Sequence, residues 1–245
     1  MSRSPVIVGV ADAPTHERGR ALPGATVLSI QRDAANEALA QAGLTMRDVD
    51  GLAVAGMWGM PGPGAMQPVL LTEYLGLEWP RYLDGTNVGG AAFVLHAGRA
   101  AEAIRSGQAD VVLIVYGSLQ KSQAARALGG RPAMFSNQWD IPAGLPLPVG
   151  AYAMAAQRHA HVYGSTRETL AEIAVATRAW AALNPAAAFR EPMTVDDVLD
   201  ARMIASPLGR YDCCLVTDGG VRRSRVRSSV VITTAPPPSV TRQQS

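Results

Sequence analysis

The amino-acid sequence predicts an α/β fold in which helices cover a mostly parallel or mixed sheet. Two observations indicate this class. Apolar segments with a strand pattern alternate along the chain with segments in which small and apolar residues recur at helical spacing, and such alternation is typical of βαβ units. The run from Asp110 to Val115 is also almost wholly apolar, as expected of a central strand that is buried on both faces.

The expected elements alternate through the first 118 residues. Pro5 to Ala11 is apolar with a β-branched bias, and an alanine-rich segment with helical spacing stops at Gly43, a residue that commonly ends helices. In chain order, we expect strands at residues 5–11, 51–55, 81–83 and 110–115, and helices before residue 43, at 67–75 and at 90–105.

The pattern changes after Ser118. Residues 119–149 are rich in glycine and proline, which predicts a long structured loop, and loops of this length are usually functional. Helices are expected to follow at about 150–163, 166–183 and 194–203.

The second of these three helices carries two further expectations. Ser165 and Glu168 have the spacing of a capping box at its start. One stripe is expected to be buried, with a threonine as its polar member; it consists of Leu170, Ile173, Ala174, Thr177 and Ala181.

The segment from Asp84 to Gly90 predicts a loop that delivers one residue to the N-terminus of a buried helix. A cysteine at such a position would be a stabilised thiolate, because unpaired N–H groups and the helix dipole favour negative charge. This chain has Gly90 there, which offers no nucleophile. Two interpretations of Gly89 and Gly90 stay open: a close backbone approach at a tight turn, or space for a substrate group whose thioester or ketone oxygen the N–H groups would bind.

An ordered set of motifs resembles the thiolase superfamily. Asn87-x-x-Gly90, with Gly107 seventeen residues later and a strand from 110 to 118, resembles the nucleophile region of that superfamily. A block from Tyr152 to Leu208 and a closing stretch at 211–219 resemble the sterol-carrier-protein type thiolases and the thiolase-like lipid-transfer proteins. The resemblance covers roughly residues 5–220.

This resemblance implies a domain organisation. The chain would be the N-terminal half of a thiolase-like fold, with a mixed five-stranded sheet covered by helices and a largely helical loop-domain insertion. Residues 1–118 would form the core and residues 119–210 the loop domain, which in thiolases covers the active site and helps to hold acyl-CoA. Residues 211–220 would return to the core.

Residues 221–245 break the family pattern. They hold five arginines and no acidic residue, and we expect a basic, Pro- and Ser-rich tail that is disordered or arises from a shifted reading frame near Gly220. The alternative is a genuine short paralogue with a disordered tail. Binding of nucleic acid is not expected, because the tail has no aromatic residue for stacking and no helical periodicity.

The resemblance also implies a chemistry. In the superfamily, a cysteine takes an acyl group from a thioester, and groups of a second half move protons and form the oxyanion holes. Because Gly90 replaces that cysteine and no second half is recognised, we expect neither thiolysis nor Claisen condensation from this polypeptide alone. The expected substrate-binding residues are Asn87, Gly89, Tyr116 and Ser118. Plainer roles stay open for two of them, a turn for Asn87 and packing for Tyr116.

The histidines and cysteines predict no metal site. His16, His159 and His161 are expected in surface or core roles, and His96 as a hydrogen-bonded structural residue on the helix after Gly90. The adjacent Cys213 and Cys214, the only two cysteines of the chain, are expected to be buried structural thiols. Asp212 and Asp218 beside them are expected to form turns and caps. Neither a metal nor a cofactor is expected, and acyl-CoA is the expected substrate or ligand.

Three function classes remain open. The first is a thiolase-superfamily protein of acyltransferase type that acts on or binds acyl-CoA thioesters. The second is a retro-aldolase-type lyase subunit for steroid or lipid side-chain CoA esters, working with a small OB-fold and zinc-ribbon partner. The third is a non-catalytic lipid or CoA-ester binding module.

Oligomeric state and location are further expectations. By resemblance, a homodimer would form through the strand near residues 81–86, and an exposed apolar face would favour self-association. The sequence has neither a run of ~18 apolar residues nor a basic-then-apolar leader pattern. We therefore expect a cytoplasmic protein with no membrane partner.

Overall fold

The computed structural model describes residues 4–13, 15–16, 19–58, 66–122, 137–140, 142–145, 148–185, 187–219 and 229–234. The chain divides into two compact units. Unit 1 comprises residues 1–123 and 217–245, and unit 2 comprises residues 124–216. The loop residues 123–136, the tail residues 220–228 and the tail residues 235–245 lie outside the described residues.

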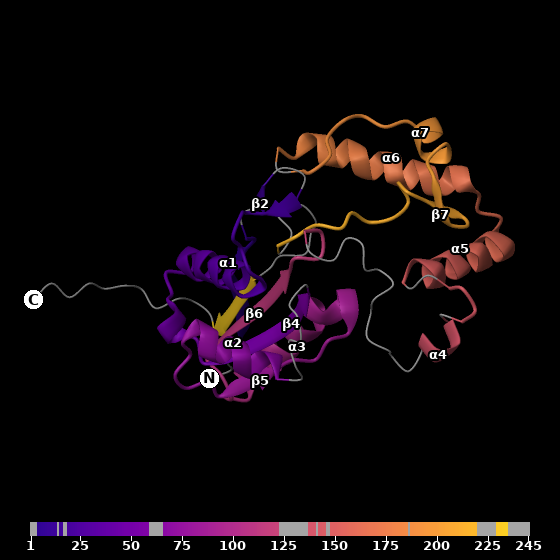
Figure 1. Cartoon of the computed structure of the whole chain (residues 1–245). Coiled ribbons are helices and arrows are strands. Elements are labelled where there is room, and N and C mark those ends of the chain that lie inside the picture. Colours follow the sequence, from indigo (N-terminus) through magenta and orange to yellow (C-terminus); the bar gives the residue numbers. More distant parts are fainter. Residues whose placement is uncertain are drawn as a thin grey trace, which may run out of the picture. The chain divides into compact units, whose positions relative to one another are not determined.

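Unit 1 is built on a five-stranded sheet with the strand order β1-β9-β6-β4-β5 (Figure 1). Strand β4 is parallel to β5 and β6, whereas β9 is antiparallel to both β6 and β1. The sheet is therefore mixed, with β9 as its single reversed strand. The strands are β1 (Pro5–Ala11), β4 (Gly51–Trp58), β5 (Tyr82–Asp84), β6 (Val111–Ser118) and β9 (Ser229–Thr234).

Helices cover both faces of this sheet. Helices α1 (Val27–Gln41) and α2 (Gln67–Leu75) share one apolar cluster with Val111, Leu113 and Val115 of β6. Helix α3 (Ala92–Arg105) shares the other cluster with Val112 and Ile114 of the same strand. Because alternate side chains of β6 enter opposite clusters, the continuous apolar run of this strand is accounted for.

Two glycines allow α1 to lie directly on the sheet. A Cβ on Gly9 would come within 1.9 Å of the carbonyl oxygen of Ala38, and one on Gly117 within 2.8 Å of the carbonyl oxygen of Val27. The helix begins at Thr26, whose side chain accepts a hydrogen bond from the N–H of Ser29 and completes a capping box.

Strand β9 corrects the expectation of a disordered tail over residues 221–245. Ser229–Thr234 pairs with β1 on one side and β6 on the other, and Val231 and Ile232 are 0% and 3% exposed. The segment contains a short β-branched run with strand propensity, but the arginines that precede this run in the sequence dominate the composition of the segment. A core strand therefore lies within the segment that composition alone assigned to a tail.

Short elements complete unit 1. Strands β2 (Thr15–His16) and β3 (Arg20–Ala21) form a small antiparallel pair. A 3₁₀ turn, η2 (Met46–Asp48), precedes β4, and another, η3 (Gly89–Ala91), precedes α3.

Unit 2 is largely helical, as expected. Its helices are α4 (Asn137–Asp140), α5 (Val149–Tyr163), α6 (Arg167–Leu183) and α7 (Val195–Leu199). Strands β7 (Met203–Ala205) and β8 (Leu208–Gly209) follow as an antiparallel pair. Helix α7 thus ends before the predicted residue 203, because the chain turns there into β7.

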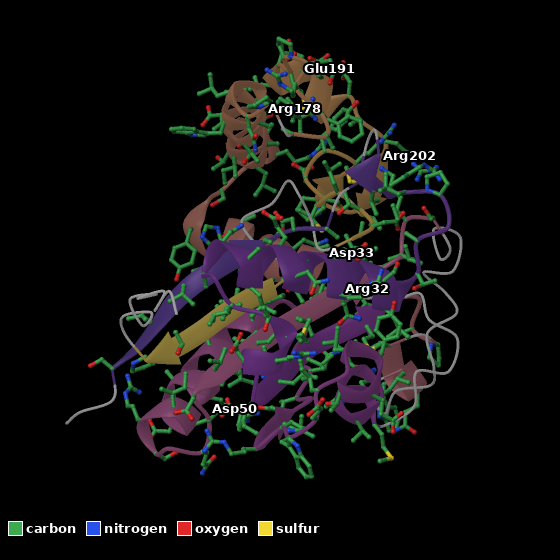
Figure 2. All side chains as sticks on the ribbon, turned by 90° about the vertical axis from the view of Figure 1, so that its left-hand side faces the viewer. Arg32, Asp33, Asp50, Arg178, Glu191 and Arg202 are labelled. Atoms are coloured by element: carbon green, nitrogen blue, oxygen red, sulfur yellow. The ribbon has the colours of Figure 1, made fainter. Side chains whose placement is uncertain are left out.

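The predicted buried stripe of α6 is wrong. Ile173 is 62% exposed and Thr177 is also exposed, whereas Ala171 is buried. The less exposed face instead runs through the buried Ala171 and the half-buried Arg167 and Arg178, of which Arg167 donates to the carbonyl oxygen of Leu199. Arg178 likewise donates to that of Glu191, and Figure 2 shows these two residues close together.

The predicted cap of α6 is also shifted by one residue. The N-cap is Thr166, whose hydroxyl accepts from the N–H of Thr169. The hydroxyl of Ser165 instead lies 2.7 Å from Nδ1 of His159. Two neighbouring hydroxyl residues compete for this position, and sequence spacing alone does not decide between them.

Candidate functional site

The loop between β5 and α3 is shaped by two side-chain caps. Oδ1 of Asp84 accepts hydrogen bonds from the N–H and hydroxyl of Thr86 at 2.8 and 2.7 Å. Oδ1 of Asn87 accepts from the N–H of Gly89 at 2.9 Å. The oxygen of Asn87 is therefore used to form the turn, which supports the plainer interpretation of that residue.

Gly89 and Gly90 differ in what the backbone requires of them. Gly89 has φ +67°, a left-handed conformation that favours glycine. Gly90 has no such constraint, and a Cβ built on it would meet no atom within 4 Å. Crowding therefore does not explain Gly90, and this exposed position before α3 has open space beside it.

Tyr116 and Ser118 lie together at the carboxyl end of β6. Burial raises the pKa of Tyr116, with a smaller opposing effect from its hydrogen bond with Ser118, so the phenol remains protonated at neutral pH. Its ring centroid lies 6.3 Å from that of Phe93. Because Phe93 follows Gly90 by three residues, the end of β6 lies beside the first turn of α3.

Sequence reasoning did not single out a polar cluster around Asp84. Its Oδ2 accepts a hydrogen bond from Nη1 of Arg99 at 2.9 Å, and the same nitrogen donates to the hydroxyl of Thr86. Burial acts to raise the pKa of Asp84, but the hydrogen bonds from Thr86 and Arg99 outweigh it and hold the pKa well below its usual range. Burial and the adjacent charge of Asp84 raise the pKa of Tyr82 to about 12.

His96 is completely buried behind this loop. Its Nδ1 lies 3.4 Å from Oδ2 of Asp84, and neither ring nitrogen has a hydrogen-bond partner within the part of the chain that the structure describes. The expectation of a hydrogen-bonded histidine is therefore wrong, although burial on α3 is as expected. The Asp-Gly-Thr turn was the one available signal for the cluster, since nothing local links residue 84 to residues 96 and 99 of α3.

Asp218 lies beside the carboxyl end of β6 and accepts several hydrogen bonds there. Its buried carboxylate accepts hydrogen bonds from the N–H groups of Ala21, Lys121 and Ser122 at 3.0, 2.7 and 2.9 Å, and also from the hydroxyl of Ser122. The N–H of Gly219 donates to the carbonyl oxygen of Ser118 at 2.7 Å. Asp218 is thus more than a turn residue, because it joins three segments of unit 1.

The two cysteines are not the buried thiols that we expected. Cys214 is exposed and Cys213 is half-buried, because they lie in an irregular segment and not in a packed element. Among the described residues, no group of three or more His, Cys, Asp and Glu side chains is arranged to hold a metal ion. The described helices include none that is long and apolar enough to cross a membrane.

Comparison with known families and proteins gives consistent matches. Residues 5–222 match the family described as Thiolase, N-terminal domain. The chain is 31% identical over 220 residues to 17-hydroxy-3-oxo-4-pregnene-20-carboxyl-CoA lyase of Mycobacterium tuberculosis, covering 86% of this chain and 54% of that protein. It is also 31% identical over 205 residues to a steroid side-chain-cleaving aldolase of Thermomonospora curvata, covering 80% of this chain and 51% of that protein.

Solved structures agree with the fold. The complex named Ltp2-ChsH2(DUF35) aldolase contains a chain that superposes with a TM-score of 0.75 at 26% identity, covering 96% of this chain and 56% of that chain. A monomeric SCP2-thiolase-like protein of Mycobacterium smegmatis superposes with a TM-score of 0.64 at 20% identity, over 95% of this chain and 46% of that chain, and shows the fold alone. The chain spans about half the length of the curated relatives that it matches.

Proposed function

Because this chain belongs to the thiolase superfamily, we propose that it binds a CoA thioester at the N-terminus of α3 and serves an aldolase-type lyase for steroid or lipid side-chain esters. The observation that carries this proposal is the open position at Gly90. A thiolase needs a sulfur nucleophile there, whereas this chain offers space in its place. The matched relatives named as a lyase and as a side-chain-cleaving aldolase support the same choice.

The chemistry of carbon–carbon cleavage suits such a site. In a retro-aldol reaction, a base takes the proton of a β-hydroxyl group, the bond between the α and β carbons breaks, and a ketone leaves. The electron pair moves into an enolate of the CoA thioester, which then takes up a proton. Negative charge therefore develops on the thioester oxygen, where helix N–H groups stabilise it. No covalent acyl-enzyme is needed.

Within this proposal, the residues around α3 bind and orient the substrate. The η3 turn at Gly89–Ala91 presents the helix N-terminus, and the neutral hydroxyl of Tyr116 supplies a donor beside it. Ser118 holds the end of β6 through its contacts with Gln120 and Gly219. We assign the general base to none of the described residues.

We also propose two protein partners. A second copy of the chain would pair along β5, because this strand ends the described sheet and carries the 42% exposed Leu83. A small OB-fold and zinc-ribbon protein would complete the lyase. The match to a chain of the Ltp2-ChsH2(DUF35) aldolase complex supports this second partner.

Binding of a β-hydroxyacyl-CoA by isothermal titration calorimetry tests the site. Filling the open position with Gly90→Phe is expected to weaken binding at least ~10-fold, which corresponds to about 1.4 kcal/mol. Gly98→Phe is the matched control, because Gly98 lies within α3, eight residues after Gly90, and a Cβ built there also meets no atom within 4 Å. Equal losses in both variants would contradict a site at Gly90.

Product analysis with the zinc-ribbon partner present separates the function classes. Release of a ketone is the expected result. Release of free CoA thiol without a ketone would instead identify an acyl-transfer enzyme. Binding without either product would leave a CoA-ester binding module.

A further inference from the structure

Two thiols occupy neighbouring positions in the segment that leaves unit 2. Cys213 is half-buried and Cys214 is exposed, and the chain has no other cysteine. The pair lies outside any described helix or strand. Neither the fold nor the proposed function uses these thiols.

The segment that holds the pair is fixed at both ends. On one side, Oδ2 of Asp212 accepts from the N–H of Gly209 at 2.7 Å, and the N–H of Asp212 donates back to the carbonyl oxygen of Gly209 at 3.2 Å. On the other side, the buried carboxylate of Asp218 accepts three backbone N–H groups. The boundary between the two units falls between these aspartates, at Val216 and Thr217.

We propose that Cys213 and Cys214 are an oxidation site, and that they form a reversible vicinal disulfide in this return segment. A peroxide is the oxidant. The sulfur of Cys214 attacks one peroxide oxygen, the O–O bond breaks, and one water leaves as the thiol becomes a sulfenic acid. The sulfur of Cys213 then attacks the sulfur of Cys214, the S–O bond breaks and a second water leaves. Two thiols are thus oxidised by two electrons, and one peroxide is reduced.

The exposure of each thiol and its charged neighbours determine which cysteine is oxidised first and which one then forms the disulfide. The exposed Cys214 is accessible to peroxide, and susceptibility to oxidation follows accessibility. Burial, together with the charges of Asp212 and Cys214, raises the pKa of Cys213, which makes this thiol the slower nucleophile toward peroxide. Cys213 therefore acts as the resolving thiol. Its adjacency in the chain gives it an effective concentration that no second molecule can match.

Reversibility follows from the spacing of adjacent residues. Neighbouring Cα atoms lie ~3.8 Å apart, which is closer than the ~4.4–6.8 Å found across ordinary disulfides. Strained disulfides of this kind are the labile, readily reduced ones. Oxidation would close a small ring between the two fixed aspartates and restrict the backbone of the segment that connects the units.

Peptide mass spectrometry after peroxide treatment of the whole chain tests the proposal. Trypsin releases residues 211–222, which contain both cysteines and no methionine. We expect this peptide to lose about 2 Da, to resist alkylation, and to recover both thiols with dithiothreitol. A trivalent arsenical, which bridges two neighbouring thiols, should protect the pair from peroxide.

Single substitutions supply the controls. In Cys213→Ser, peroxide should leave a sulfenic acid on Cys214 that a dimedone probe captures. In Cys214→Ser, the half-buried Cys213 should react at least ~10-fold more slowly than Cys214 does in the first variant. Disulfide-linked dimers or a sulfinic acid as the main product of the unmodified chain would overturn the proposal.

Discussion

Single aspartates join segments that are distant in sequence. Asp50, labelled in Figure 2, accepts hydrogen bonds from the N–H groups of Asp110 and Val111 and from the side chain of Arg81. Asp84 and Asp218 hold other segments in the same way. Each carboxylate accepts hydrogen bonds from at least one backbone N–H and from further donors at once, and leaving such donors without an acceptor is costly.

Asp218 gives the strongest prediction of this kind. Asp218→Ala is expected to lower the free energy of unfolding by about 3 kcal/mol, because three N–H groups lose their acceptor. Urea denaturation followed by circular dichroism measures this change. The matched control is Asp33→Ala, since the ion pair of Asp33 with Arg32 is solvent-exposed and such pairs contribute little. Equal effects of both substitutions would show that Asp218 does not join the segments.

Asp84 predicts a dependence of stability on pH. Its folded-state pKa lies below that of the unfolded chain, which is about 3.9. The stabilisation from its ionised form is therefore complete above that pH and is lost as pH falls through the folded pKa. The stability difference between the unmodified chain and Asp84→Asn should be largest at neutral pH and shrink below about pH 4. Urea midpoints measured across this range would contradict the assignment if the difference stayed constant.

The site was only partly predictable at the residue scale. Gly90 and the turn at Asn87 follow from a local pattern, because a turn and a helix start lie within a few residues of each other. The contacts of Asp84 with His96 and Arg99 depend on how α3 lies against β5. A buried histidine twelve residues from its carboxylate leaves no local signature.

At the scale of elements, the turn that leads into α3 contains two adjacent glycines, and we predict opposite effects on stability when each is replaced by alanine. Gly90→Ala should raise stability by about 0.4–1 kcal/mol, because it restricts the unfolded chain and meets no clash. Gly89→Ala should lower stability by about 1–2 kcal/mol, because Gly89 is left-handed. Thermal unfolding of the two variants provides the comparison. The same sign for both would mean that the turn has a different conformation.

Strand β9 makes the second prediction at this scale. Ile232 is 3% exposed and lies opposite Ile7 of β1, which is 60% exposed. Ile232→Ala is expected to destabilise unit 1 by about 2–4 kcal/mol, whereas the matched Ile7→Ala should cost less than about 1 kcal/mol. Chemical denaturation measures both. Similar small losses would show that β9 does not lie in the interior of the sheet between β1 and β6.

Elements were predictable where local pattern and tertiary packing agree. The expected α2 matches its observed bounds of Gln67–Leu75. Strand β6 was predicted from a continuous apolar run, which indicates burial on both faces of the sheet. Strand β9 was missed because its pairing partners lie over 100 residues away in sequence. The inward face of α6 was misjudged because it includes two arginines that donate to backbone carbonyl oxygens beside the buried Ala171, and apolar periodicity does not indicate such contacts.

At the scale of the molecule, the described sheet has two unlike ends. It ends at β1 and at β5, and a strand at the edge of a sheet offers unpaired N–H and C=O groups to another chain. Strand β5 is the short one, and it leads directly into the loop before α3. A dimer through β5 would therefore place the partner copy beside the candidate site, whereas one through β1 would not.

The two ends allow the dimer to be tested by matched charge substitutions. Light scattering after size exclusion should give twice the chain mass for the unmodified protein. Leu83→Lys should give the monomer, because a lysine on an edge strand opposes pairing. Ile7→Lys, on the other edge and more exposed than Leu83, should leave the dimer intact. Dissociation by Ile7→Lys alone would show that the interface lies at β1. A monomeric unmodified chain would contradict the proposed dimer. If Leu83→Lys also weakens thioester binding while Ile7→Lys does not, the partner copy supports the loop that carries Gly90.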